Sequence, residues 1–226
     1  MSVCPTGALG ICGKDPADSV PKSSMPSPEA VDALMLNRRT CRDYKDQDVD
    51  PVLLQHMLQI VGTAPSAGCH QQVEFTTFPD KESFARFKTY FWDKVVENAE
   101  QGIYPFGFSD KDFALVKRGM DRGKDVVFRG APNVLLIHAP MDRGNWEVDT
   151  AIAMTYAELL FNANGLGTVI ASFAGAALKT LPEVRVQLGI PEDHFLQCPL
   201  LFGVPSITFS RGVQRFDHLK VHLVDF

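Results

Sequence analysis

Val134 to Ile137 is a run of four apolar residues that follows Ala131 and Pro132. A strand whose side chains are all apolar belongs in the interior of a sheet, because neither of its faces offers polar groups to water. Apolar residues at helical spacing flank this run, from about 81 to 98 and from about 147 to 164. Strands and helices therefore interleave, and the expected fold class is α+β or α/β.

Two helices near the N-terminus are predicted from the same start signal. Ser27 and Asp50 are the expected N-caps, and each precedes a proline at the first helical position. The first helix is expected to bury one stripe, made of Val31, Leu34 and Met35. The second is expected to end near Gly62 and to bury Leu54, Met57, Leu58 and Val61.

The rest of the chain predicts a series of shorter elements. A helix is expected from Asp110 to about Phe128, and another from Pro182 to about Leu188. The strands are expected at 75–78, 168–170 and 200–202, and the alternating tail 219–224 could add one more. The helix from about 147 to 164 is expected to end at Gly165. Its inward face is expected to carry Ile152, Tyr156, Leu159 and Leu160.

Residues 1–27 predict an irregular leader, and residues 28–226 predict one folded domain. The leader is rich in Pro, Ser and Gly, which break any periodicity. Within it, Cys4 to Leu9 resembles the last cysteine segment of a bacterial ferredoxin motif. An iron–sulfur cluster needs further cysteines at close spacing upstream, and this sequence lacks them. A remnant of a ferredoxin-like segment is the interpretation.

Charge and composition exclude several classes of function. The net charge of −5 argues against nucleic-acid binding, because a phosphate backbone demands a basic surface. No apolar run approaches the roughly 20 residues of a membrane span, so no membrane partner is expected. The five cysteines show no disulfide pattern, which favours a cytoplasmic location. The six histidines show no metal-ligand spacing, so no metal is expected.

Two segments carry candidate binding residues. Arg38, Arg39, Thr40 and Arg42 place three guanidinium groups and a hydroxyl within five residues, which suits a ligand phosphate. The alternative is a solvated basic corner beside neighbouring aspartates. After the second helix, residues 63–72 combine small residues with Pro and Gly, which let the backbone approach a flat ligand. The alternative there is an ordinary helix-terminating loop.

The order of four segments resembles the nitroreductase family over roughly residues 28–226. The first two are the arginine segment and Ala64-Pro65-Ser66-Ala67-Gly68, one helix apart. The other two are Asp149 to Ala153 with its helix and 165–168, and Phe202 to Pro205 followed by Arg211 and Arg215. The leader adds a similarity to the members that carry an N-terminal ferredoxin domain.

The resemblance implies a three-layer α+β sandwich, with a mixed sheet flanked by helices, in an intertwined homodimer. It also implies FMN at each of two subunit interfaces. The phosphate and ribityl end would lie on Arg38, Arg39, Thr40, Arg211 and Arg215. Arg42 would lie near the pyrimidine edge of the ring. The flavin face would be lined by Ile170, Ala171 and Ser172, with Pro65, Ser66, Ala67 and the residue at Cys69 supplied by the partner subunit.

The sequence departs from the family pattern in the second segment. Cys69 stands where the family has Asn, Gln72 where it has Pro, and Val73 where it has Trp. The first change removes an amide contact to FMN, and the last alters the wall beside it. These departures bear on the substrate class more than on flavin binding.

The function that the resemblance implies is ping-pong transfer of reducing equivalents from NAD(P)H, through FMN, to nitroaromatic, quinone or similar small acceptors. The flavin performs the chemistry, so no catalytic side chain is expected. A second reading is a dedicated reductase, such as a dehalogenase or enone reductase, with ferredoxin as an alternative donor. Val73 and the loop 104–108 would then shape specificity. A third is a non-catalytic flavin-binding protein.

Overall fold

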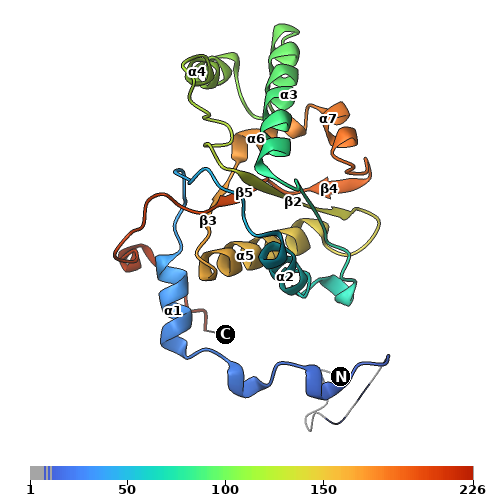
Figure 1. Cartoon of the computed structure of the whole chain (residues 1–226), viewed down its shortest axis with the longest axis vertical. Helices are drawn as coiled ribbons and strands as arrows, with labels where there is room; N and C mark the ends of the chain where they lie inside the picture. Colours follow the sequence, from blue (N-terminus) through green and yellow to red (C-terminus); the bar gives the residue numbers. More distant parts are fainter. Residues whose placement is uncertain (1–7, 9, 11, 226) are drawn as a thin grey trace.

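The computed structural model describes residues 8, 10 and 12–225. Figure 1 shows helices on both sides of a central sheet. The elements in chain order are α1 Pro28–Asn37, α2 Pro51–Val61, β1 Glu74–Thr77, α3 Lys81–Glu100, α4 Asp110–Asp121, β2 Asn133–Pro140, α5 Trp146–Ala163, β3 Gly167–Ile170, α6 Ser172–Leu178, α7 Pro182–Gln187, β4 His194–Leu196 and β5 Leu200–Gly203. Short 3₁₀ turns lie at Pro16–Asp18, Lys22–Ser24, Ala67–Cys69 and Phe216–His218.

The sheet has five strands. Four of them follow the order β1-β2-β5-β3, and β4 pairs with β2 at residues 138–140, beyond residues 133–135 that pair with β5. Every pair of named strands is antiparallel. Parallel pairing enters through one isolated bridge between Thr40 and Thr168, which attaches the arginine segment to β3. Helices and an antiparallel sheet together make the predicted α+β class.

Two hydrophobic cores fill the space between the three layers. Val134 and Leu136 of β2 point into the core under α3 and α6, and Leu135 and Ile137 point into the core under α2 and α5. All four side chains are at most 2% exposed. The prediction that this strand is covered on both faces is confirmed, and Figure 1 shows the helices that cover it.

Both predicted N-caps are confirmed, but α1 does not bury its apolar stripe. The Ser27 hydroxyl accepts from Ala30 N, and the Asp50 carboxylate accepts from Val52 N. In α2, Met57 and Val61 are fully buried. No residue of α1 is buried, and Met35 is 56% exposed, because α1 lies at the margin of the domain and packs mainly on α5.

The inward face of α5 was predicted only in part: Ile152 and Leu160 pack against the core, but Tyr156 does not. Tyr156 is 43% exposed, while the buried positions include Ala153, Ala157 and Phe161. The two alanines let α5 lie close to β2, and Tyr156 of the expected stripe faces the surface. Tyr156 lines an apolar hollow on the outer surface, and Ile152 reaches the edge of the same hollow.

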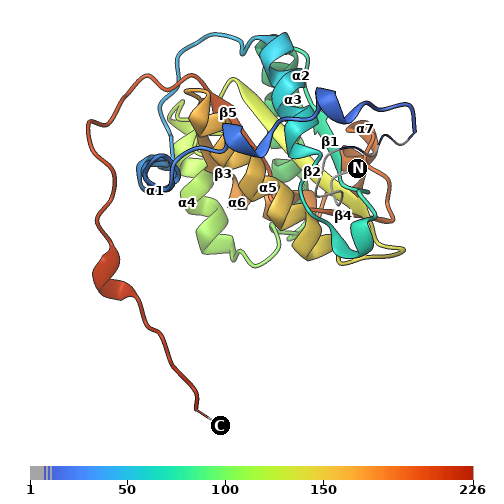
Figure 2. The same ribbon diagram turned by 90° about the horizontal axis from the view of Figure 1, so that it is seen from below.

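Two further predictions were wrong, and two elements were not foreseen. The predicted helix from Asp110 ends at Asp121 rather than Phe128, because Gly123 adopts a left-handed φ of +74°. The tail 219–224 forms no strand in the single chain, and Figure 2 shows it leading away from the body. The sequence had not indicated α6 or β4, which are 7 and 3 residues long.

The described part of the leader adds no residue to either core. Residues 8, 10 and 12–27 contain two 3₁₀ turns, and Pro16–Asp18 is capped by the Asp15 carboxylate. The ferredoxin-like segment Cys4 to Leu9 falls, except for Ala8, outside the described residues. Among the helices that the structure describes, none is both long and apolar enough to span a membrane.

Candidate functional site

Backbone hydrogen bonds bring the arginine segment and the chain after β5 side by side. Cys41 N donates to Thr168 O at 2.8 Å, and Lys45 N donates to Val204 O at 2.8 Å. Further along, Val213 N donates to Leu36 O at 2.9 Å. The two stretches that carry the predicted phosphate-binding arginines therefore meet, although the side chains of Arg211 and Arg215 are exposed.

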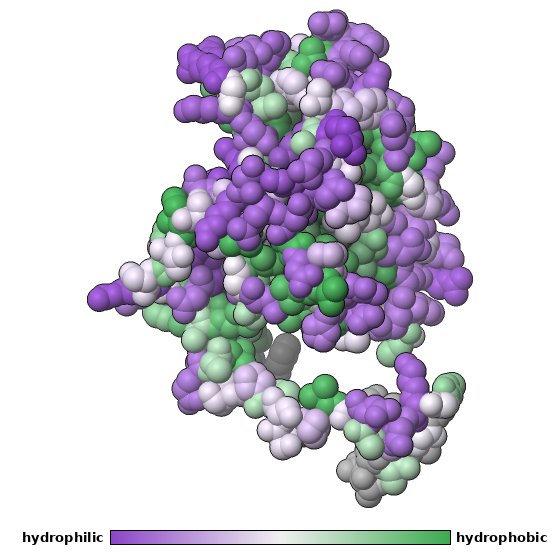
Figure 3. All heavy atoms as spheres, in the orientation of Figure 1, coloured by the Kyte–Doolittle hydropathy of each residue, from purple (hydrophilic) through white to green (hydrophobic). Residues whose placement is uncertain are grey.

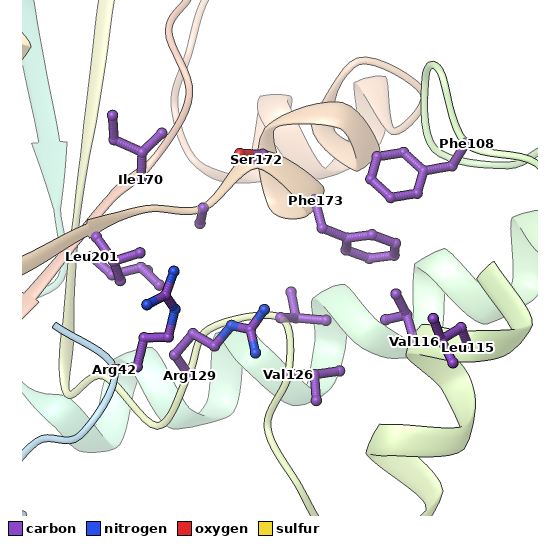
Figure 4. Close-up of a pocket in the computed structure, with 13 residues that line it drawn as sticks. Arg42, Phe108, Leu115, Val116, Val126, Arg129, Ile170, Ser172, Phe173 and Leu201 are labelled. Carbon is purple, nitrogen blue, oxygen red and sulfur yellow. The ribbon is translucent and has the colours of Figure 1, made fainter. Parts of the chain in front are cut away.

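A cavity of about 450 Å³ opens at the junction of β3 and α6. Figure 4 shows Arg42 and Arg129 next to each other along one side, facing the backbone between Ile170 and Phe173. The remaining walls are apolar, formed by Phe108, Leu115, Val116, Val126, Val127, Val169, Ala171 and Leu201. Of the predicted site residues, the structure brings Arg42, Ile170, Ala171 and Ser172 together here.

The start of α6 contributes backbone amides to this cavity. Ala171 is the N-cap residue, no side chain caps the helix, and Ala171 N is bound to Pro199 O at 2.8 Å. The first amides of a helix have no partner within the helix, so those at Ser172 and Phe173 are available to a ligand. Ile170 is 39% exposed at the same edge.

Arg129 is a site residue that the sequence analysis missed. It follows the end of α4 in a loop whose backbone adopts left-handed φ values of +55° at Arg129 and +68° at Gly130. The Asp125 carboxylate holds this loop by accepting from Phe128 N at 2.7 Å and from Gly130 N at 3.1 Å. The expected helix to Phe128 concealed the loop, and Gly123 with Gly130 was the signal that could have revealed it.

Arg39 and Thr40 line a second cavity of about 420 Å³ rather than the first. The Arg39 guanidinium lies 4.0 Å from the centre of the Phe209 ring, a cation–π contact with the segment after β5. Arg38 forms an ion pair with Glu158, with Nη1 and Oε1 2.9 Å apart. Thus the three predicted arginines of this segment have three different surroundings in the single chain.

The loop after α2 lines neither cavity in this chain. Asp149, which is 2% exposed, accepts from Ala67 N at 3.0 Å through Oδ1, and its Oδ2 has no hydrogen-bond partner among the described residues. Ser66 Oγ accepts from Gln71 N at 2.9 Å, and Cys69 has a left-handed φ of +55°. Contacts within the same chain therefore fix the shape of this loop. The loop lies away from the cavity at β3.

Burial changes the acidity of two groups beside the arginine segment. It raises the pKa of the Cys41 thiol, although a backbone hydrogen bond at Asp43 opposes the change. The protonated thiol donates from Sγ to Asp43 O at 3.3 Å. Burial also raises the pKa of Tyr44, whose hydroxyl donates to Cys41 O at 3.0 Å. Both groups therefore stay protonated at neutral pH and hold this turn through hydrogen bonds.

A separate titratable cluster lies on β1, β2 and β4. His138 and His194 are 2% and 7% exposed, and their Nδ1 atoms are 2.9 Å apart. Burial is the largest effect on the pKa of His138 and lowers it, while the Glu74 carboxylate opposes that change. None of these residues lines the cavity at β3.

The fold and its cavity define a layered α+β protein with a cationic, partly apolar ligand site at the end of β3. The chain belongs to the Nitroreductase family, whose model matches residues 35–204. The comparison with curated proteins gave no match.

Solved structures with the same fold include proteins of different activity. A nitroreductase with bound FMN from Desulfitobacterium hafniense DCB-2 is 22% identical, with a TM-score of 0.66 over 88% of this chain and 100% of that one. A second, from Bacteroides fragilis NCTC 9343 and also with bound FMN, is 16% identical, with a TM-score of 0.65 over 87% and 100%. An iodotyrosine deiodinase bound to FMN and 3-iodo-L-tyrosine is 18% identical, with a TM-score of 0.60 over 85% and 98%.

Proposed function

We propose that this protein is an FMN-dependent oxidoreductase that passes reducing equivalents from NAD(P)H to nitroaromatic, quinone or similar small acceptors. The observation that carries the proposal is the cavity in which Arg42 and Arg129 face the first amides of α6. Membership of the Nitroreductase family and the bound FMN of two solved nitroreductases support it.

The donor set of the cavity fits a flavin ring. A volume of about 450 Å³ lies within the range of about 300–1,000 Å³ that is usual for ligand pockets. Valine and phenylalanine walls suit a planar aromatic system, and they exclude water from its face. Two guanidinium groups suit the negative charge that develops on the ring when it is reduced.

The proposed roles combine the positions in the cavity with the roles that the family resemblance implies. Arg42, with Arg129 beside it, places positive charge at the pyrimidine edge, and the amide at Ser172 donates to the reactive edge of the ring. The phosphate and ribityl end is assigned to Arg38, Arg39, Thr40, Arg211 and Arg215. Bound FMN supplies the two-electron chemistry between donor and acceptor, so no acidic, basic or nucleophilic side chain is required.

A homodimer is part of the proposal. Side chains on the outer faces of three helices are apolar and exposed, among them Met35 of α1, Val52 of α2 and Val148 of α5. Figure 3 shows apolar side chains gathered over α2. Leu223 in the tail is 94% exposed. Surfaces of this kind mark interfaces, and a second chain would supply Pro65, Ser66, Ala67 and Cys69 to the cavity.

The chemistry of the cysteines supports a cytoplasmic location. Cys12, Cys41, Cys69 and Cys198 are free thiols in the described part of the chain. Free thiols persist where the surroundings are reducing.

Anaerobic reduction of the purified protein tests the proposal. The protein is expected to be yellow, and addition of NADH or NADPH should bleach the visible flavin absorbance in proportion to the donor added. Arg42→Ala and Arg129→Ala should each slow bleaching or weaken flavin retention at least about tenfold, whereas Arg122→Ala, which changes an exposed arginine outside the cavity, should not. A colourless protein that does not take up added FMN would refute the proposal.

A dedicated reductase is the second candidate function. The similarity to iodotyrosine deiodinase favours it, as do Val73 at the position of the family's Trp and Phe108 in the cavity wall. Failure of both nicotinamides, together with reduction by ferredoxin, would select this reading. Flavin that no donor reduces would indicate a non-catalytic flavin-binding protein.

A further inference from the structure

Two histidines and a glutamate from three neighbouring strands share one face of the sheet. Glu74 begins β1 and lies directly opposite His138 of β2. His138 pairs with Leu196 of β4, so His194, two residues earlier, lies diagonally across on the same face. These residues are far apart in the sequence, and for that reason the spacing of the histidines gave no sign of a site.

The possible ligand atoms of the three residues converge on one small volume. His138 Nδ1 is 2.9 Å from His194 Nδ1 and 4.0 Å from Glu74 Oε2. All three ligand atoms lie within 4.8 Å of one another. Two nitrogens at the usual bond length from a tetrahedral zinc ion are about 3.3 Å apart. The two rings therefore need to separate by only a few tenths of an ångström to admit the ion.

Neighbouring groups already orient the His138 imidazole and hold the backbone at His194. The other nitrogen of His138, Nε2, lies 3.0 Å from Thr76 Oγ1, so His138 can donate there and keep the Nδ1 lone pair facing His194. A hydrogen bond on the second ring nitrogen is the usual support of a metal-bound histidine. Arg185 fixes the start of β4 by donating from Nη2 to His194 O at 2.6 Å. Its positive charge opposes binding of a cation, and the Glu74 carboxylate offsets it.

We propose that Glu74, His138 and His194 form a binding site for a divalent ion of the zinc class. Two imidazole nitrogens and a carboxylate oxygen are ligands typical of zinc, and three protein ligands leave a fourth position for water. The Glu74 side chain is 58% exposed, so the site opens to solvent at the margin of the sheet. A bound ion would fasten β1, β2 and β4 to one another.

This site is distinct from the proposed flavin cavity. The cavity lies at β3 and α6, whereas the three ligands lie on β1, β2 and β4, and Figure 1 shows β3 and β4 at opposite sides of the sheet. The metal proposal does not depend on the proposed redox function.

Zinc titration of the full chain tests the proposal. Because thiols also bind zinc, Cys4, Cys12 and Cys69 are first changed to Ser, and the protein is stripped with EDTA. Calorimetric titration with ZnCl₂ should then give one ion per chain at micromolar affinity or better, and the melting temperature should rise with zinc. Glu74→Gln and His194→Ala should each weaken binding at least about tenfold, a loss in the range seen when groups around a metal are removed.

Glu74→Gln and one control variant keep the result interpretable. Glu74→Gln changes an exposed side chain, so this variant is expected to fold even where His194→Ala does not. His56→Ala, on the exposed side of α2, removes a histidine outside the cluster and should leave zinc affinity unchanged. No saturable binding below about 100 µM zinc, or equal affinity in Glu74→Gln and His56→Ala, would overturn the proposal.

Discussion

Arg38 and Glu158 form an ion pair that joins the end of α1 to α5, with 2.9 Å between Nη1 and Oε1. The same carboxylate oxygen accepts from Thr168 Oγ1 at 3.3 Å, and Asn162 Nδ2 donates to Thr168 Oγ1 at 3.1 Å. The Glu158 side chain is only 17% exposed. The proposed phosphate ligand therefore also neutralises a largely covered carboxylate, and substitution of Arg38 changes both functions at once.

Variants of the two partners separate the structural role of Arg38 from its role toward FMN. Arg38→Ala should lower the free energy of unfolding by about 1 kcal/mol, because Glu158 is left with Thr168 alone, and it should lower flavin retention. Glu158→Gln should cost similar stability but leave Arg38 free to bind phosphate. Urea unfolding of the flavin-free protein and the flavin-to-protein ratio after gel filtration measure the two effects. Equal flavin loss in both variants would contradict the phosphate role.

The buried Asp149 carboxylate should determine the shape of the loop after α2. Asp149→Ala removes the acceptor for Ala67 N, which should cost about 1–3 kcal/mol of stability and speed amide exchange through residues 66–72. Asp149→Asn keeps an acceptor oxygen at the same place and serves as the matched control. Hydrogen exchange read by mass spectrometry reports the change. Unchanged exchange in Asp149→Ala would show that the loop is held by other contacts, such as that between Ser66 and Gln71.

Gly167 should tolerate no side chain. A Cβ built there would lie 2.5 Å from Cys41 Cβ and 2.6 Å from Cys41 Sγ, and the hydrogen bond from Cys41 N to Thr168 O prevents the segment from moving aside. Gly167→Ala should therefore lower the free energy of unfolding by about 1–3 kcal/mol and weaken flavin retention. Gly62→Ala is the control, because Gly62 ends α2 with an ordinary helical φ of −61°. A thermal melt that is equal in both variants would contradict the close packing.

The sequence predicted those parts of the fold that depend on local signals. Ser27 and Asp50 cap their helices as expected, because an N-cap needs only a polar side chain and the amides that follow it. The four apolar residues of β2 indicated a strand covered on both faces. The outward turn of Tyr156 was not predictable in this way, because the rotation of α5 depends on how closely Ala153 and Ala157 let it approach the sheet.

The candidate site was foreseen only where it is local or where the family resemblance supplied it. Arg42 and Ile170 to Ser172 share a cavity as expected. Arg129 depends on a left-handed turn after a helix that ends early, and the metal cluster depends on strand register, so neither was visible in the spacing of residues. The assignment of Arg38, Arg39 and Arg215 to one phosphate stays a prediction, since their guanidinium groups have separate surroundings here.

The Cys41 thiol should be unreactive although it lies between two candidate ligand-binding arginines. Burial raises its pKa, and the thiolate is the form that reacts with alkylating reagents. At pH 8, iodoacetamide should therefore modify Cys41 at least about tenfold more slowly than the exposed Cys12 of the leader, with peptide mass spectrometry to separate the two. Because the folded-state pKa is raised, the Cys41 rate should keep increasing with pH beyond about 8.5, the ordinary thiol pKa, and unfolding in urea should remove the difference between the two residues. Fast modification of native Cys41 at pH 8 would mean that the arginine segment opens readily and that the thiol is not protected by burial.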